Sequence, residues 1–128
     1  MKEELEKMAA ELQQIQDFLD IEASDNPEEL TERLSAMNVY LARSGKLMAD
    51  AQYILAKEKD AVFSEFGSRM FNAPPSIVKE LLAARTADAS YVYLWAERIN
   101  RTIVHAGDNI RTQVSYGKEN LKLTRTGY

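Results

Sequence analysis

The chain has 128 residues, a net charge of −4 and ordinary shares of hydrophobic (45%) and charged (28%) residues, which suit one folded domain. It has no cysteine, so disulfides, thiolate catalysis and cysteine-ligated zinc are excluded. No apolar run approaches the roughly 20 residues that span a bilayer, and the acidic start lacks a signal-peptide core. We therefore expect a cytoplasmic protein without a membrane partner.

A first helix is predicted over residues 2–22. Apolar residues recur there at alternating steps of three and four, which places them on one helix face. They are Leu5, Met8, Leu12, Ile15 and Leu19. Asn26 suits the cap of a new helix, and Pro27 suits its first position. The first helix should therefore end before Asn26, and a second helix should begin at Pro27.

A second, much longer helix is predicted over residues 27–71, because one apolar face persists through the whole stretch. Its members are Leu30, Leu34, Met37, Leu41, Met48, Leu55, Val62, Phe66 and Met70. Gly45 interrupts this helix and indicates either a bend or a close helix crossing. We favour the crossing, since Ser44 and Ala49 beside it are also small.

The stretch Asn72-Ala73-Pro74-Pro75 is the strongest helix-breaking signal after residue 27. A third helix should follow over residues 75–117, with a weak segment at 87–90 that leaves a break open, and 124–128 should form a loose tail. We therefore predict one all-α domain, 1–128, in which a short N-terminal helix accompanies an antiparallel hairpin of two long helices. Either a three-helix bundle or a coiled-coil-like arrangement fits.

The third helix carries an aromatic girdle that is apolar on every side. It comprises Tyr91, Tyr93, Leu94 and Trp95 around Val92. A helix that is apolar all round is buried on more than one side, so these residues are candidates for a homo-oligomer interface. The alternative is that the two tyrosines lie along the surface with hydrated hydroxyl groups.

A polar row follows on the same helix, with steps of three and four. Its members are Arg98, Arg101, His105, Asp108 and Thr112. The two arginines could hold a phosphate or an acidic group, with Arg111 as a further candidate. The other interpretations are a solvated helix back with paired charges, and a polar network between subunits.

Templates for catalysis fail, so we expect neither an enzyme nor a bound cofactor or metal. The chain has one histidine and no glycine-rich phosphate loop, and it lacks the Glu-x-x-His pairs of carboxylate metal sites in helical bundles.

The charge distribution leaves DNA open as a partner. Residues 1–30 carry two lysines and ten carboxylates, whereas residues 85–128 carry seven basic and four acidic residues. Self-complementation, a basic surface for nucleic acid and an acidic surface that mimics it all fit this asymmetry. The candidate phosphate contacts do not share one helix face, which weakens the DNA interpretation. They are Arg98, Arg101, Arg111, Lys118, Lys122 and Arg125.

Two stretches, 39–46 and 97–118, resemble small uncharacterised helical proteins of tailed phages and prophages. Such proteins are often encoded near recombination or replication functions, which implies a bacterial host cell but no activity. The combination of an acidic first helix with two long helices is also similar to phage Gam-type inhibitors of host recombination nucleases, although no Gam motif is present.

The function predicted from the sequence is that of a non-enzymatic, homo-oligomeric helical interaction protein. It would act as an accessory or inhibitor in phage DNA recombination or replication, or against host defence, on an unidentified protein partner. The alternatives are a nucleic-acid-binding protein and a sponge for phosphate-containing ligands with a pocket between subunits.

Overall fold

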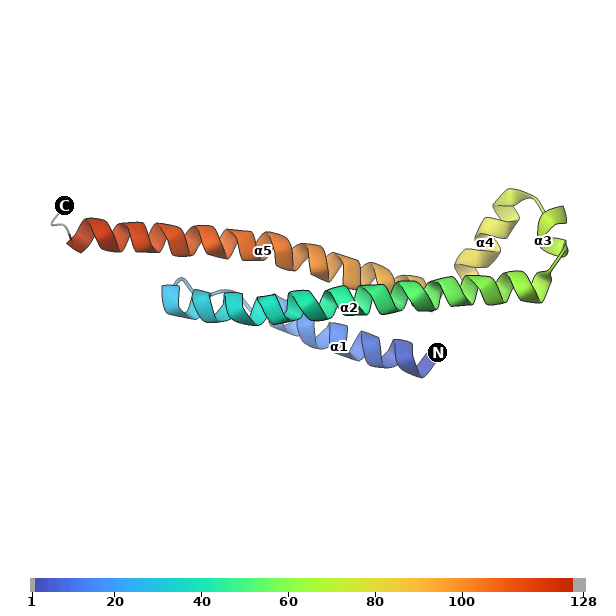
Figure 1. Cartoon of the computed structure of the whole chain (residues 1–128), viewed down its shortest axis with the longest axis horizontal. Helices are drawn as coiled ribbons and strands as arrows, with labels where there is room; N and C mark the ends of the chain where they lie inside the picture. The colour runs from blue at the N-terminus through green and yellow to red at the C-terminus, as the bar shows by residue number, and fades with distance from the viewer. Residues whose placement is uncertain (1, 126–128) are drawn as a thin grey trace.

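The computed structural model describes residues 2–125, with side chains for residues 2–119, and all the regular elements in that range are helices. These are α1 (Lys2–Asp20), α2 (Pro27–Phe66), α3 (Arg69–Asn72), α4 (Pro75–Arg85) and α5 (Ala87–Arg125). Helices α2 and α5 lie side by side in opposite directions, and α1 packs along the middle of this pair (Figure 1). The predicted all-α class is confirmed. None of the described helices is long and apolar enough to cross a membrane.

Three helices contribute to one hydrophobic core. The predicted stripe of α1 faces it, and Leu12 is fully buried there. Helix α2 supplies Leu30, Met37, Leu47, Ala51 and Ile54, and α5 supplies Ala89, Val92, Ala96, Ile99, Ile103 and Ile110. A bidentate ion pair between Arg43 and Glu11, at 2.6 and 2.8 Å, also links α1 to α2 at the surface.

Helix α2 begins as predicted but ends early. The Asn26 side chain accepts a hydrogen bond from the Glu28 amide at 2.9 Å, and Pro27 occupies the first turn. The predicted end at residue 71 is wrong, because Gly67 adopts a φ of 56° and stops the helix after Phe66. The apolar spacing of four from Val62 to Phe66 and on to Met70 continues across this break, so periodicity could not reveal it.

The chain reverses through a corner built from α3 and α4. Ala73 and Pro74 are extended between these helices, so the predicted break is present. The predicted helix 75–117 is nevertheless two helices, since α4 ends at Arg85 and α5 starts at Ala87. The buried Thr86 hydroxyl donates to the Leu82 carbonyl at 2.6 Å. Such a side-chain bond to the preceding turn is known to bend helices.

Helix α5 does not end at Gly117, which corrects the predicted boundary. It passes the start of α2 at this point, where a Cβ on Gly117 would lie 3.4 Å from Pro27 Cγ. The C-terminal part of α5 extends beyond the start of α2 (Figure 1). Of the predicted tail, Thr124 and Arg125 belong to α5, and the remaining positions lie outside the described residues.

The two long helices are in contact at Gly45. A Cβ added to Gly45 would lie 3.7 Å from Asn100 Nδ2, which is ordinary van der Waals contact. Asn100 Nδ2 donates at 3.0 Å to the hydroxyl of the fully buried Ser44, which donates to the Leu41 carbonyl. The helices therefore pack against each other at this level, and the packing leaves room for a methyl group at Gly45.

Substitution of Gly45 and Gly67 by alanine should have opposite effects. Gly45→Ala should stabilise the fold by about 0.5–1 kcal/mol, because alanine loses less backbone entropy in a helix and has room here. Gly67→Ala should destabilise it by about 1–3 kcal/mol, since a side chain is strained at that positive φ. Urea unfolding followed by circular dichroism measures both. Destabilisation by Gly45→Ala would mean that the helices pack more closely than described.

Candidate functional site: the outer face of helix α5

One face of α5 points away from the core along most of its length. Positions at steps of three or four along this face are all exposed, and we call them the outer row. The outer row consists of Tyr91, Leu94, Arg98, Arg101, His105, Asp108, Thr112 and Tyr116. It joins part of the predicted aromatic girdle to the whole predicted polar row on one continuous surface.

Two charges of this surface are paired within the helix. Arg101 forms an ion pair with Glu97, one turn earlier, and Asp108 pairs with Arg111 at 3.0 Å. Asp108 thus pairs with Arg111, which lies outside the row, rather than with the row residues Arg101 or His105. Arg98 has no ion pair among the residues whose side chains are described. The row therefore presents its least compensated positive charge at Arg98.

The aromatic girdle divides into two halves. Tyr93 and Trp95 are half-buried and pack against the core of their own chain. The Trp95 Nε1–H donates to Gln16 Oε1 of α1 at 3.1 Å, so this side chain fastens α1 to α5. Tyr91 and Leu94 are 63% and 47% exposed. Of the four interface candidates, these two are exposed and the other two are half-buried.

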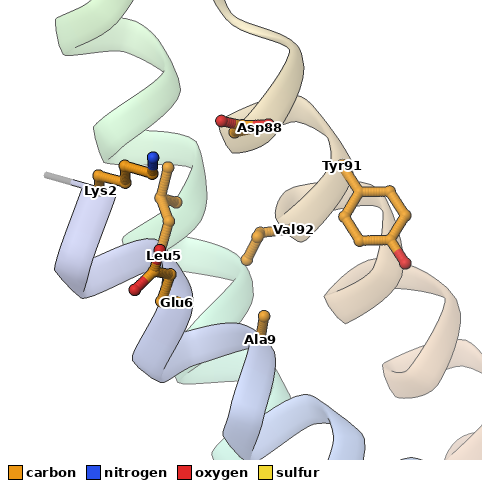
Figure 2. A pocket seen from close by; sticks show the side chains of 7 residues that line it. All are labelled: Lys2, Leu5, Glu6, Ala9, Asp88, Tyr91 and Val92. Carbon is orange, nitrogen blue, oxygen red and sulfur yellow. The ribbon is translucent and has the colours of Figure 1, made fainter.

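A small pocket opens where α1 meets the start of α5 (Figure 2). It has a volume of about 250 Å³ and is lined by Lys2, Leu5, Glu6, Ala9, Asp88, Tyr91 and Val92. Figure 2 shows the Tyr91 ring at one side with its hydroxyl group pointing away from Leu5. The volume of the pocket is below the roughly 300 Å³ at which small-molecule sites usually begin. We interpret this pocket as an extension of the outer surface at Tyr91 rather than as a ligand cavity.

Glu58 of α2 is a titratable residue near this pocket that the sequence analysis did not identify. Burial raises the pKa of its carboxyl, and the nearby Asp88 carboxylate raises it further. Asp88 lies in the segment predicted to be weak helix, and nothing in the sequence indicated that it would face α2. The proximity of these two carboxylates follows from the α2–α5 pairing.

The candidate phosphate contacts are dispersed over α5. Arg98 and Arg101 lie on the outer row, whereas Lys118 lines a depression with Glu28 and Glu32 at the start of α2. The side chains of Lys122 and Arg125 lie outside the described residues. Within the described part of the chain, the acidic and basic ends therefore meet around Lys118, as the self-complementation interpretation expects.

The chain matches no family model, no curated protein and no solved structure. Among the described residues, no three His, Asp or Glu side chains are grouped so that they could hold a metal ion. The case for a function therefore rests on the geometry of α5.

Glu58→Gln should stabilise the protein at pH 7. When the pKa of a carboxyl is higher in the folded than in the unfolded state, the protein loses stability as the pH rises through the folded pKa. The glutamine side chain does not ionise, so the variant avoids that loss. Its gain in the free energy of unfolding should vanish below the ordinary glutamate pKa of 4.5. Urea midpoints at pH 7 and pH 4 measure the difference.

Asp88→Asn provides the control for this titration, because it removes the neighbouring negative charge while leaving Glu58 in place. On the Asp88→Asn background, Glu58→Gln should gain less at pH 7 than in the natural chain. An equal gain on both backgrounds would contradict the coupling between the two carboxylates.

Proposed function

We propose that this chain is a non-enzymatic helical interaction protein that binds partners through the outer row of α5. The observation that carries the proposal is the exposure of Tyr91 and Leu94, at 63% and 47%, directly beside Arg98. Tyrosine and arginine are enriched among the residues that dominate binding energy at protein interfaces. An apolar end joined to a charged stretch is the composition of an interface core with its polar rim.

The proposed partners include a second copy of the chain. A self-complementary face gives closed dimers, the commonest form of soluble oligomer. The resemblance to phage proteins supports an accessory or inhibitory role in DNA recombination or replication, or against host defence. The heterologous partner in that role would be a protein that docks on the same row.

Replacement of Tyr91 and Leu94 should weaken self-association. We expect a homo-oligomer at micromolar concentration by light scattering coupled to size-exclusion chromatography. Tyr91→Ser with Leu94→Ser should raise the dissociation constant at least about tenfold, since each truncation at an interface core commonly costs more than about 1 kcal/mol. The measurement is the molar mass across a dilution series.

Tyr53→Ser with Val39→Ser is the matched control. These α2 side chains are 64% and 62% exposed. Their replacement therefore removes a comparable apolar surface, but on α2 rather than on α5. The control should retain the mass of the natural chain. A monomer at every concentration for the natural chain, or equal losses in both variants, would contradict self-association through α5.

Nucleic-acid binding is the second candidate, favoured by Arg98 and His105 on one exposed face between Tyr91 and Tyr116. It ranks lower because Arg101 and Arg111 are paired with carboxylates and Lys118 lies beside Glu28 and Glu32. A phosphate-ligand sponge ranks lower still, since Arg101 is already paired with Glu97.

Measuring affinity for single- and double-stranded DNA across a salt series decides the nucleic-acid candidate. If binding occurs through phosphate contacts, the logarithm of the association constant falls linearly with the logarithm of the salt concentration. Arg98→Ala would then reduce the slope of that line by about one. We expect no binding at low salt; a salt-dependent affinity that Arg98→Ala weakens would replace interaction with protein as the leading function.

A further inference from the structure

The outer row is symmetric about the level of Ile103. Leu94 and Thr112 lie nine residues on either side of it, Arg98 and Asp108 five, and Arg101 and His105 two. Tyr91 and Tyr116 lie 12 and 13 residues away. Two such helices in antiparallel contact, with a twofold axis at the level of Ile103, would place each row residue opposite another row residue.

We propose that two copies pair through antiparallel contact of their α5 outer rows, in the register that places Arg98 opposite Asp108 of the second copy. This inference rests on the proposed self-association and adds the orientation, the register and the residues that set them. It commits the exposed face of α5 to a second copy of this chain, because its charge order is complementary to itself only in this orientation.

Charge order excludes the parallel alternative. The row runs from positive at Arg98 and Arg101 to negative at Asp108. A parallel pair would bring each of these charges against its own copy, and like charges at such spacing are destabilising. The antiparallel pair brings Arg98 against Asp108 twice, and the Asp108 carboxylate, whose Oδ1 pairs with Arg111 of its own helix, meets it as the shared partner of two arginines. Arg98 has no carboxylate partner among the described side chains of its own chain, so the second copy supplies one.

The ends of the row add apolar contact to this charge pairing. Tyr91 is 63% exposed and Tyr116 67% exposed, and the proposed register places them opposite each other at both ends. Leu94 faces the methyl group of Thr112. Tyr91 and Tyr116 are 25 residues apart, so the contact would extend about 37 Å along the helix at ~1.5 Å per residue.

The centre of the contact brings Arg101 near His105 of the second copy. Arg101 keeps its ion pair with Glu97, which offsets its charge. The register therefore leaves no arginine at the centre without a compensating carboxylate.

Engineered cysteines test the register cleanly, because the natural chain contains none. A mixture of Leu94→Cys and Thr112→Cys proteins, allowed to exchange subunits and then oxidised, should form the mixed 94–112 disulfide in preference to either homodimer. In the antiparallel register the two thiols of a Leu94→Cys homodimer would lie about 18 positions apart, or about 27 Å along the helix. Tyr53→Cys, on α2, provides the background rate of random collision.

Charge reversal provides a second, independent readout. Arg98→Glu and Asp108→Arg should each weaken the dimer by about tenfold, since each acts at two symmetric pairs. The double variant restores opposite charges across the interface and should recover most of the affinity. A residue with only a structural role would give additive losses in the double variant instead.

The outcomes separate this inference from the proposed function. A natural chain that is monomeric by light scattering would overturn both. A dimer in which Leu94→Cys couples to itself, or in which the 94–112 disulfide forms no faster than the Tyr53→Cys background, would overturn the register and leave self-association in place. Preferential 94–112 coupling together with charge-reversal rescue would establish it.

Discussion

The part-buried hydrogen bond between Asn100 and Ser44, in a largely apolar seam, is the polar contact that constrains how the two long helices pair. Shifting α5 by one heptad would place Asn100 opposite Met37 or Ala51, both of which are buried. The amide would then lose its partner, at a cost of about 1–3 kcal/mol for an unsatisfied buried group. A single polar residue in a helical seam is a known means of fixing register. Here it fixes the register of α5 against α2, while the buried apolar stripe of α5 sets which face turns inward and therefore which face remains for a partner.

Helix α1 completes the core on one side of this pair and leaves the outer row uncovered. Its buried stripe anchors it, and two polar contacts orient it: Glu11 with Arg43 and Gln16 with Trp95. The Trp95 contact explains why a helix that is apolar on every side near residue 93 need not be buried on every side. Tyr93 and Trp95 pack within the chain. Tyr91 and Leu94 remain exposed and lie on the same face as the charged residues of the outer row.

Much of this architecture follows from periodicity, because burial of one helix face is a local property of the sequence. Periodicity predicts the stripe of Leu5, Met8, Leu12 and Ile15, and all four are buried. It fails at Gly67, where a positive φ ends α2 without disturbing the apolar spacing. It also fails at Trp95 and Glu58, whose partners lie on other helices. Those contacts depend on how the helices are placed in space, which a helical wheel does not contain.

The uneven charge of the chain gains a physical meaning from the fold. Lys118 meets the acidic start of α2, Arg43 meets Glu11, and Arg101 and Arg111 find carboxylates on their own helix. Two of the cations that the sequence offers to nucleic acid, Arg101 and Arg111, are therefore already paired with carboxylates. Arg98 differs from these cations because the residues four positions before and after it on α5, Leu94 and Thr102, are not acidic. A cation beside exposed apolar side chains needs a partner that supplies both a carboxylate and an apolar surface, and a protein helix does so more readily than a phosphate backbone.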